Sequence, residues 1–217
     1  MLTSLTSSLV TTAAGVLLLT AVLQTWRRSA AGAVRLLVAQ GLGLATLVGA
    51  LGVSRGGAEL LGVAALVAVV KAGVLPWMLS RTATGRLVDR DLTTRPVIGV
   101  LGATVLAMFA YAVSDPLRGG DQTPAGRALP AAVALVLIGF WILLTRHAAV
   151  FQLVGFLVLD NGIATVAFLT SDGLPLTVEL GATLDVLLVV VILRTLTSRM
   201  RDTHGGTSVG DLSELRD

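Results

Sequence analysis

Apolar residues are gathered along the chain into long runs that short polar segments interrupt. Seven of these runs have roughly the 17–25 residues that a helix needs to cross a bilayer. The sequence therefore predicts an all-α fold, a polytopic membrane protein of seven transmembrane helices. The fourth run is the weakest of the seven because it is short. The predicted spans are 5–25, 33–53, 60–79, 97–113, 129–145, 148–170 and 174–194.

Composition supports this prediction. Hydrophobic residues make up 54% of the 217 residues and charged residues 13%, and the mean hydropathy is +0.87. A soluble domain carries about 25% charged residues. The chain is too short to add a large soluble domain to seven spans, so we expect one membrane domain over 1–201 and a polar tail over 202–217.

The basic residues predict the orientation of these helices. Loops rich in Arg alternate with loops whose charges cancel, and loops with excess Arg belong on the cytoplasmic side. Charge follows the first run and none precedes it, which argues against a cleaved signal peptide. We expect the N-terminus outside and the C-terminus in the cytoplasm of a bacterial plasma (inner) membrane, and no nucleic-acid binding from the net charge of +3. The predicted inner basic residues are Arg27, Arg28, Arg81, Arg86, Arg90, Arg95, Arg146, Arg194, Arg199 and Arg201.

Several redox groups are excluded by the residues that the chain lacks. It has no Cys, so it can form no disulfide, iron–sulfur cluster or thiolate metal site. Its two histidines, His147 and His204, both lie outside the middle of a predicted helix, which excludes a bis-His haem within the bilayer. We therefore expect no cofactor or metal in this chain and no electron transfer by it alone.

Four ionisable residues nevertheless lie within predicted spans: Lys71, Asp160, Glu179 and Asp185. Each central charge costs about 2.5–3.5 kcal/mol on insertion scales, so four would cost on the order of 10 kcal/mol if unpaired. At a rise of 1.5 Å per residue, Asp160 and Asp185 lie roughly 17 Å along their helices, near mid-membrane. Lys71 is about as deep, and Glu179 lies nearer the outside.

Two interpretations of these residues stay open. Burial disfavours the charged form of each group, so carboxylates and an ammonium at one level suit proton exchange. The same groups would also serve as static ion pairs that hold helices together. Pro76 is expected to disturb the third helix and free backbone carbonyls close to Lys71. In the second helix, small residues at four-residue spacing, Gly41, Ala45 and Gly49, allow close helix packing.

The polar residues near the C-terminus carry a family resemblance. The motif Asp160-Asn161-Gly162 is followed by Pro175-Leu176, then Glu179-Leu180-Gly181 and finally Asp185. This order resembles the E component of hydrogenase-4 and formate hydrogenlyase-type complexes, which also has a Lys before a Pro in an earlier helix, as Lys71 and Pro76 are here. The acid before Asn161 is Asp, where Glu is usual in that family.

The last three helices, within 128–201, also resemble the small K-type subunit of respiratory complex I and of multisubunit cation/proton antiporters. The ending Ser213-Glu214-Leu215-Arg216 is similar to the end of that subunit. The four preceding helices, within 1–127, match mainly in hydropathy. The resemblance implies a subunit of a complex-I-like membrane arm in which Lys71, Asp160, Glu179 and Asp185 join a polar axis for protons or sodium ions, supported by Pro76 and Asn161. It implies antiporter-like subunits and subunits that anchor a quinone or hydrogenase module as partners.

Three other functions remain as alternatives. A stand-alone secondary transporter would show an inverted repeat or a pair of broken helices, and the sequence shows neither. A purely structural subunit would use the same ionisable groups only as ion pairs. A membrane-embedded enzyme would need a nucleophile–base or metal constellation, which the spans do not contain, so we expect a non-catalytic subunit of an oxidoreductase complex.

Overall fold

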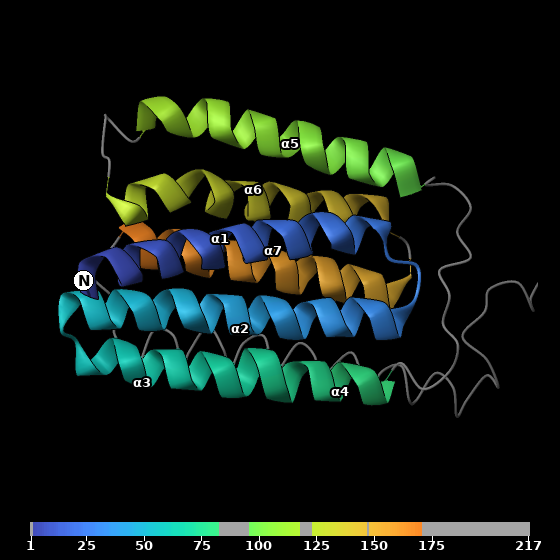
Figure 1. Cartoon of the computed structure of the whole chain (residues 1–217). Helices are drawn as coiled ribbons and strands as arrows, with labels where there is room; N and C mark the ends of the chain where they lie inside the picture. Colours follow the sequence, from blue (N-terminus) through green and yellow to red (C-terminus); the bar gives the residue numbers. More distant parts are fainter. Residues whose placement is uncertain (1, 83–95, 118–122, 147, 171–217) are drawn as a thin grey trace, which may run out of the picture.

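Each apolar run that the structure describes forms a helix. The computed structural model describes residues 2–82, 96–117, 123–146 and 148–170 (Figure 1). Six of its helical segments are long and apolar enough to cross a membrane. The seventh predicted span, 174–194, and the tail lie outside the described residues. The elements are α1 (Leu2–Trp26), α2 (Ala30–Arg55), α3 (Ala58–Val67), η1 (Ala68–Val74), α4 (Leu75–Thr82), α5 (Pro96–Leu117), α6 (Pro124–Thr145) and α7 (Ala149–Thr170).

Local sequence accounts for several helix ends. Ser29 begins α2 as its N-cap, because its side chain accepts a hydrogen bond from the Gly32 N–H. Gly56 ends α2 in the left-handed conformation, with φ of 67°, which glycine adopts without a steric penalty. Thr123 caps α6 in the same way as Ser29 caps α2, and Pro124 follows at a first-turn position where its missing N–H costs nothing.

The third span, Ala58–Arg81, consists of α3, η1 and α4 in one continuous rod. Its middle part, η1, is a π-helix, and the Leu75 N–H after it bonds to the carbonyl of Val70, five residues earlier. Pro76 follows directly and has no N–H to complete an α-helical bond to Ala72. The disturbance that Pro76 predicts is therefore found as a π-helical segment just before it.

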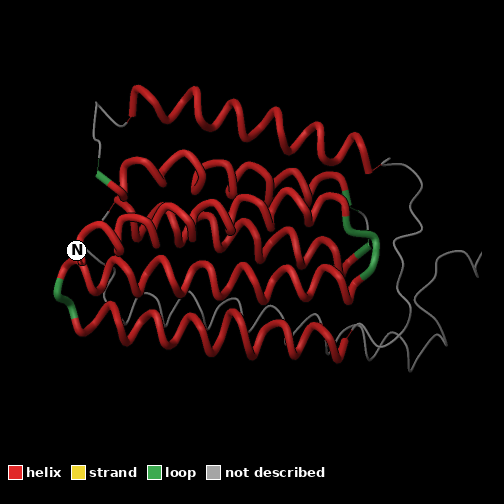
Figure 2. Tube along the Cα trace, viewed as in Figure 1, coloured by secondary structure: helices red, strands yellow, loops and turns green. Residues whose placement is uncertain are grey.

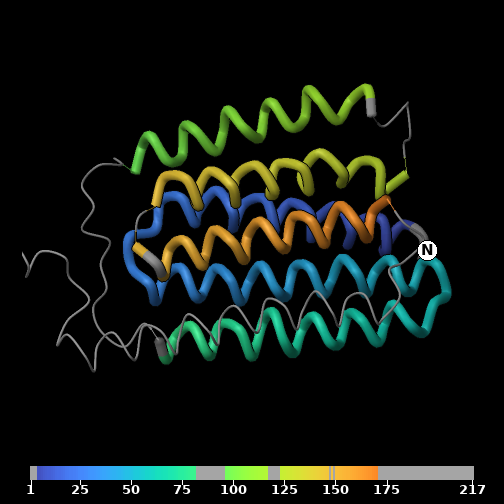
Figure 3. The backbone as a smooth tube through the Cα atoms, turned by 180° about the vertical axis from the view of Figure 1, so that it is seen from behind, coloured from blue at the N-terminus to red at the C-terminus, as the bar shows by residue number. Residues whose placement is uncertain are grey.

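The helices lie side by side and alternate in direction, and the described α1–α2 and α2–α3 connections are short and lie at opposite ends of the bundle (Figures 1 and 2). Helix α2 is central, since it packs against α1, the whole third span and α7. Helix α6 packs against α7, α5 and α1, and α5 lies at the edge (Figure 3). The apolar core between them includes Leu17, Leu44, Val63, Leu135 and Phe168, which are all fully buried.

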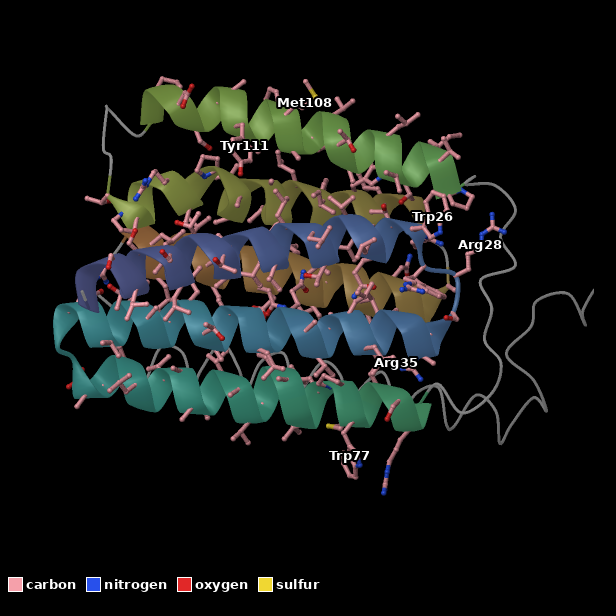
Figure 4. All side chains as sticks on the ribbon, viewed as in Figure 1. Trp26, Arg28, Arg35, Trp77, Met108 and Tyr111 are labelled. Atoms are coloured by element: carbon pink, nitrogen blue, oxygen red, sulfur yellow. The ribbon has the colours of Figure 1, made fainter. Side chains whose placement is uncertain are left out.

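The Arg146 side chain links the C-terminal ends of α1 and α6. Arg146 Nη2 donates to the carbonyl oxygens of Thr25, at 2.5 Å, and Arg27, at 3.3 Å. The α1–α2 and α6–α7 connections therefore share one end of the bundle, where Arg28 and Arg35 also project (Figure 4). The predicted grouping of Arg27 with Arg146 is confirmed, and the side of the membrane that this end faces remains a prediction.

The outer faces of the edge helices are apolar. Val105 and Met108 on α5 are 63% and 68% exposed, and Trp77 on α4 is 52% exposed. Both Met108 and Trp77 point away from the bundle (Figure 4). Exposed apolar side chains on long apolar helices fit contact with lipid rather than with water.

Candidate functional site: an ion pair in the middle of the bundle

The structure brings together two of the four predicted ionisable residues. Lys71 Nζ donates to Asp160 Oδ2 at 2.8 Å, and the two residues are 89 positions apart in the sequence. The Lys71 side chain is 4% exposed and that of Asp160 is 19% exposed. Such a buried pair is stable only when both charges are held close, because each loses its hydration.

Both residues lie near the middle of their helices. Asp160 is twelve residues into the 22-residue helix α7, and Lys71 occupies the central π-helical segment of the third span. The predicted similarity in depth is thus matched by direct contact. π-Helical turns within α-helices occur often at functional sites.

Three glycines hold α7 tightly against α6, and we call this contact the glycine joint. A Cβ atom at Gly139, Gly155 or Gly162 would lie less than 3.0 Å from backbone atoms of the opposite helix. Gly139 faces the backbone of Leu159, the residue just before Asp160. Successive residues of an α-helix are about 100° apart, so fixing Leu159 also fixes the direction in which Asp160 projects.

Lys71 is placed by a second close approach, between α2 and η1. A Cβ at Gly41 would lie 2.7 Å from the Lys71 carbonyl carbon and 2.7 Å from the Ala72 nitrogen. Only glycine allows α2 to come this close. Gly49, further along the same helix, faces Ala64 at ordinary contact distance. The small-residue spacing thus correctly predicts close packing, and its tightest point is at the backbone of Lys71.

An uncharged amide pair lies beside the ion pair. Asn161 Nδ2 donates to Gln40 Oε1 at 3.2 Å, and Gln40 is fully buried in α2. Asn161 also accepts through its backbone oxygen from the Thr165 hydroxyl at 2.6 Å. We call Lys71, Asp160, Asn161 and Gln40 the polar layer.

Sequence reasoning found Asn161 but missed Gln40. The available signal was an amide well inside a long apolar run, directly before the first glycine of the small-residue series.

A small cavity borders the polar layer. About 10 Å³ of it is open to the centre of a water molecule, which is near the lower limit for holding one water. Lys71 and Asn161 supply its polar lining, and Pro76 forms part of its apolar wall. The other lining residues are Leu37, Leu75 and Leu157.

Glu179 and Asp185, the other two predicted site residues, lie outside the described residues. Within the described ranges, no group of three or more His, Asp or Glu side chains is arranged to hold a metal ion. The described site is therefore an ammonium, a carboxylate and two amides in an apolar surrounding, a set that can carry and stabilise protons.

Comparison with known proteins gives one full-length and one partial relationship. The chain is 23% identical over 137 residues to hydrogenase-4 component E of Escherichia coli (strain K12), and equally to that of Shigella flexneri. This alignment spans 63% of the chain and 63% of each of those relatives. No protein-family profile and no solved structure matches the chain.

The full-length relationship is to a mycobacterial protein. Over 215 residues the chain is 40% identical to the uncharacterized protein Rv0085 of Mycobacterium tuberculosis (strain ATCC 25618 / H37Rv), and the alignment covers 97% of each. Identity at this level over the whole length shows common descent. The chain belongs to the same family as Rv0085, and it is itself a multi-helical membrane protein distantly related to hydrogenase-4 component E.

Proposed function

We propose that this protein is a membrane-arm subunit of an energy-converting, complex-I-like assembly related to hydrogenase-4, and that the polar layer is part of its path for protons or sodium ions. The observation that carries the proposal is the Lys71–Asp160 ion pair in the middle of the bundle. The distant relationship to hydrogenase-4 component E supports the kind of complex.

The chemistry of the pair suits proton exchange. An ammonium and a carboxylate 2.8 Å apart can pass one proton between them and become a neutral amine and a neutral acid. The balance between these two states responds to any charge that arrives nearby, because surrounding hydrocarbon screens charge weakly. Asp160 is the more exposed partner, so exchange with water or with the next group of the path takes place at its carboxylate.

The proposed path extends beyond the described residues through Glu179 and Asp185. Redox groups would belong to partner subunits, among them antiporter-like subunits and those that anchor a quinone or hydrogenase module. In this proposal the arginine-rich end of the bundle that carries Arg27 and Arg146 faces the bacterial cytoplasm, as the positive-inside rule expects.

The ion pair also supports a second candidate function, a purely structural subunit. In that case Lys71 and Asp160 hold the third span to α7 and move no proton. Removing one partner of a buried pair then leaves the other charge uncompensated, at a cost of about 3–5 kcal/mol.

Single and double neutral variants distinguish the two functions. Asp160→Asn and Lys71→Met each remove titration while nearly keeping side-chain size. Proton exchange predicts near-normal assembly of both single variants with partner subunits, together with loss of redox-driven proton or sodium uptake by inside-out membrane vesicles. Val69→Met is the matched control, because Val69 is 63% exposed on the outer face near Lys71.

A structural clamp gives the opposite pattern. Assembly would then fail in each single variant, and the double variant Lys71→Met with Asp160→Asn would restore both assembly and transport. Full transport in a well-assembled Asp160→Asn protein would remove Asp160 from the path. Affinity purification of the full chain from native membranes, with identification of the bound subunits, tests the assembly directly, and ion transport by the chain alone would instead indicate a stand-alone transporter.

A further inference from the structure

The amide of Gln40 is buried without being fully satisfied. Gln40 is 0% exposed, and its Nε2 atom has no hydrogen-bond partner among the described residues. Rotating both amides by 180° would reverse the bond to Asn161 and leave the Gln40 oxygen unpartnered instead. A leucine of similar size would fill the same space without this penalty, so packing alone does not explain a glutamine here.

Gln40 lies where it can act on both ends of the ion pair. Its side chain holds Asn161, the residue that follows Asp160 on α7. Its neighbour on α2, Gly41, is the point of closest approach to the Lys71 backbone. The hydrogen bond between Gln40 and Asn161 therefore links α7, which carries the Asp160 carboxylate, to α2, which packs against the Lys71 backbone.

We propose that Gln40 is a positioning residue for the Lys71–Asp160 pair. Through Asn161 it holds the side of α7 that lies opposite the glycine joint against α2, and so sets the distance and angle of the Asp160 carboxylate to Lys71. The effect of Gln40 on ion transport rests on the proposed function, whereas its effect on the position of the pair does not.

The chain offers a direct reporter of this position, because Lys71 is its only lysine. Full-length protein labelled with ζ-¹⁵N-lysine, carrying a tag without lysine and placed in lipid bilayers, gives a single side-chain nitrogen signal by solid-state NMR. Gln40→Leu is expected to move this signal by more than its wild-type linewidth, because the carboxylate changes its distance or angle to Nζ.

Gln24→Leu is the matched control. Gln24 is also buried, at 2% exposed, and it also has one unsatisfied amide atom. Its Nε2 donates to the Ala33 carbonyl at 3.0 Å, which links α1 to α2 away from the ion pair. The Lys71 signal should therefore stay within its linewidth in this variant.

A rescue variant keeps the test decisive if Gln40→Leu folds poorly. Gln40→Asn combined with Asn161→Gln exchanges the two amides and keeps the total length of the pair. The exchanged variant should restore the wild-type signal, whereas Gln40→Asn alone should not. An unmoved signal in Gln40→Leu, or an equal shift in Gln24→Leu, would overturn the proposal, as would a wild-type signal in Gln40→Asn alone.

The same sample separates this inference from the proposed function. The position of the Lys71 signal at one fixed pH reports on Gln40, and its change with pH in the wild type reports on proton exchange. If Gln40→Leu shifts the signal and a change of pH does not shift it in the wild type, the positioning role stands and proton exchange is contradicted.

Discussion

Helix α7 contacts its neighbours through two opposite faces that differ in the kind of contact they make. Toward α6 it presents Gly155, Leu159 and Gly162, which fall within about 60° of one another on a helix of 3.6 residues per turn. Toward α2 and the third span it presents Asp160 and Asn161, centred roughly opposite to that face. The first face meets α6 backbone to backbone, and the second meets its neighbours through polar side chains.

The two faces respond differently to a change of charge or proton. A backbone contact of glycine has no side chain to rearrange, so it fixes the distance and direction of α7. The polar face meets its neighbours only through side chains, so a change of charge there alters these contacts directly. The comparison teaches that α7 is anchored to α6 by its backbone, whereas its contacts with α2 and the third span depend on individual side chains.

Breaking the glycine joint should have the largest effect. Gly139→Val places two methyl groups and a Cβ against the backbone of Leu159, which cannot yield as a flexible side chain would. The loss of stability should exceed the roughly 1–3 kcal/mol of ordinary overpacking. We expect little monodisperse protein after detergent extraction and a lowered Tm. Gly73→Ala is the control, since its Cβ would meet nothing within 4 Å, and it should keep wild-type yield.

Reversing the ion pair should have the next largest effect, and on transport alone. The double variant Lys71→Asp with Asp160→Lys retains one ammonium and one carboxylate of the same combined reach. We expect recovery of the assembled complex within about twofold of wild type, because a close buried pair is kept, but loss of ion transport, because the carboxylate no longer sits on α7. Normal transport would show that the order of the groups does not matter.

The smallest effect should come from a matched pair of substitutions on α2. In Gly41→Ala the new methyl group meets the Lys71 backbone and should cost about 1–3 kcal/mol. In Gly49→Ala it meets the Ala64 side chain at 3.6 Å, an ordinary contact, and replacing a mid-helix glycine should gain about 0.5–1 kcal/mol. Tm values of opposite sign relative to wild type would confirm the difference, and equal values would contradict it.

Hydropathy predicted where the helices lie better than where they end. The first predicted span, 5–25, ends one residue before α1 does, whereas the fourth, 97–113, ends four residues before α5 (Pro96–Leu117) does. Hydropathy ends a predicted span near the first charged residue, here Asp115. A helix continues for as long as its backbone hydrogen bonds can form. The π-helical segment could not be read from the sequence either, because it depends on which carbonyl each N–H reaches.

The sequence predicted how far along their helices the site residues lie, but not toward which neighbouring helix they point. The rise per residue places Lys71 and Asp160 at one level, yet it does not say how each helix is rotated, so the partner of Lys71 stayed open until the structure showed Asp160. Gln40 was missed because sequence reasoning about out-of-place groups within spans considered ionisable residues, and glutamine carries no charge. Glu179 and Asp185 remain predictions outside the described residues.

The π-helical segment has a consequence for comparing this chain with its relatives. A bond that reaches back five residues accommodates one more residue than an α-helical turn, so the third span equals a regular helix that has gained a single residue between Ala68 and Val74. A relative that lacks this residue would form a regular α-helix here, and the parts before and after the gap would keep their orientation, because the π-helical turn absorbs the extra residue. A one-residue gap at this place in an alignment therefore marks a local change of backbone around Lys71, not a lost helix.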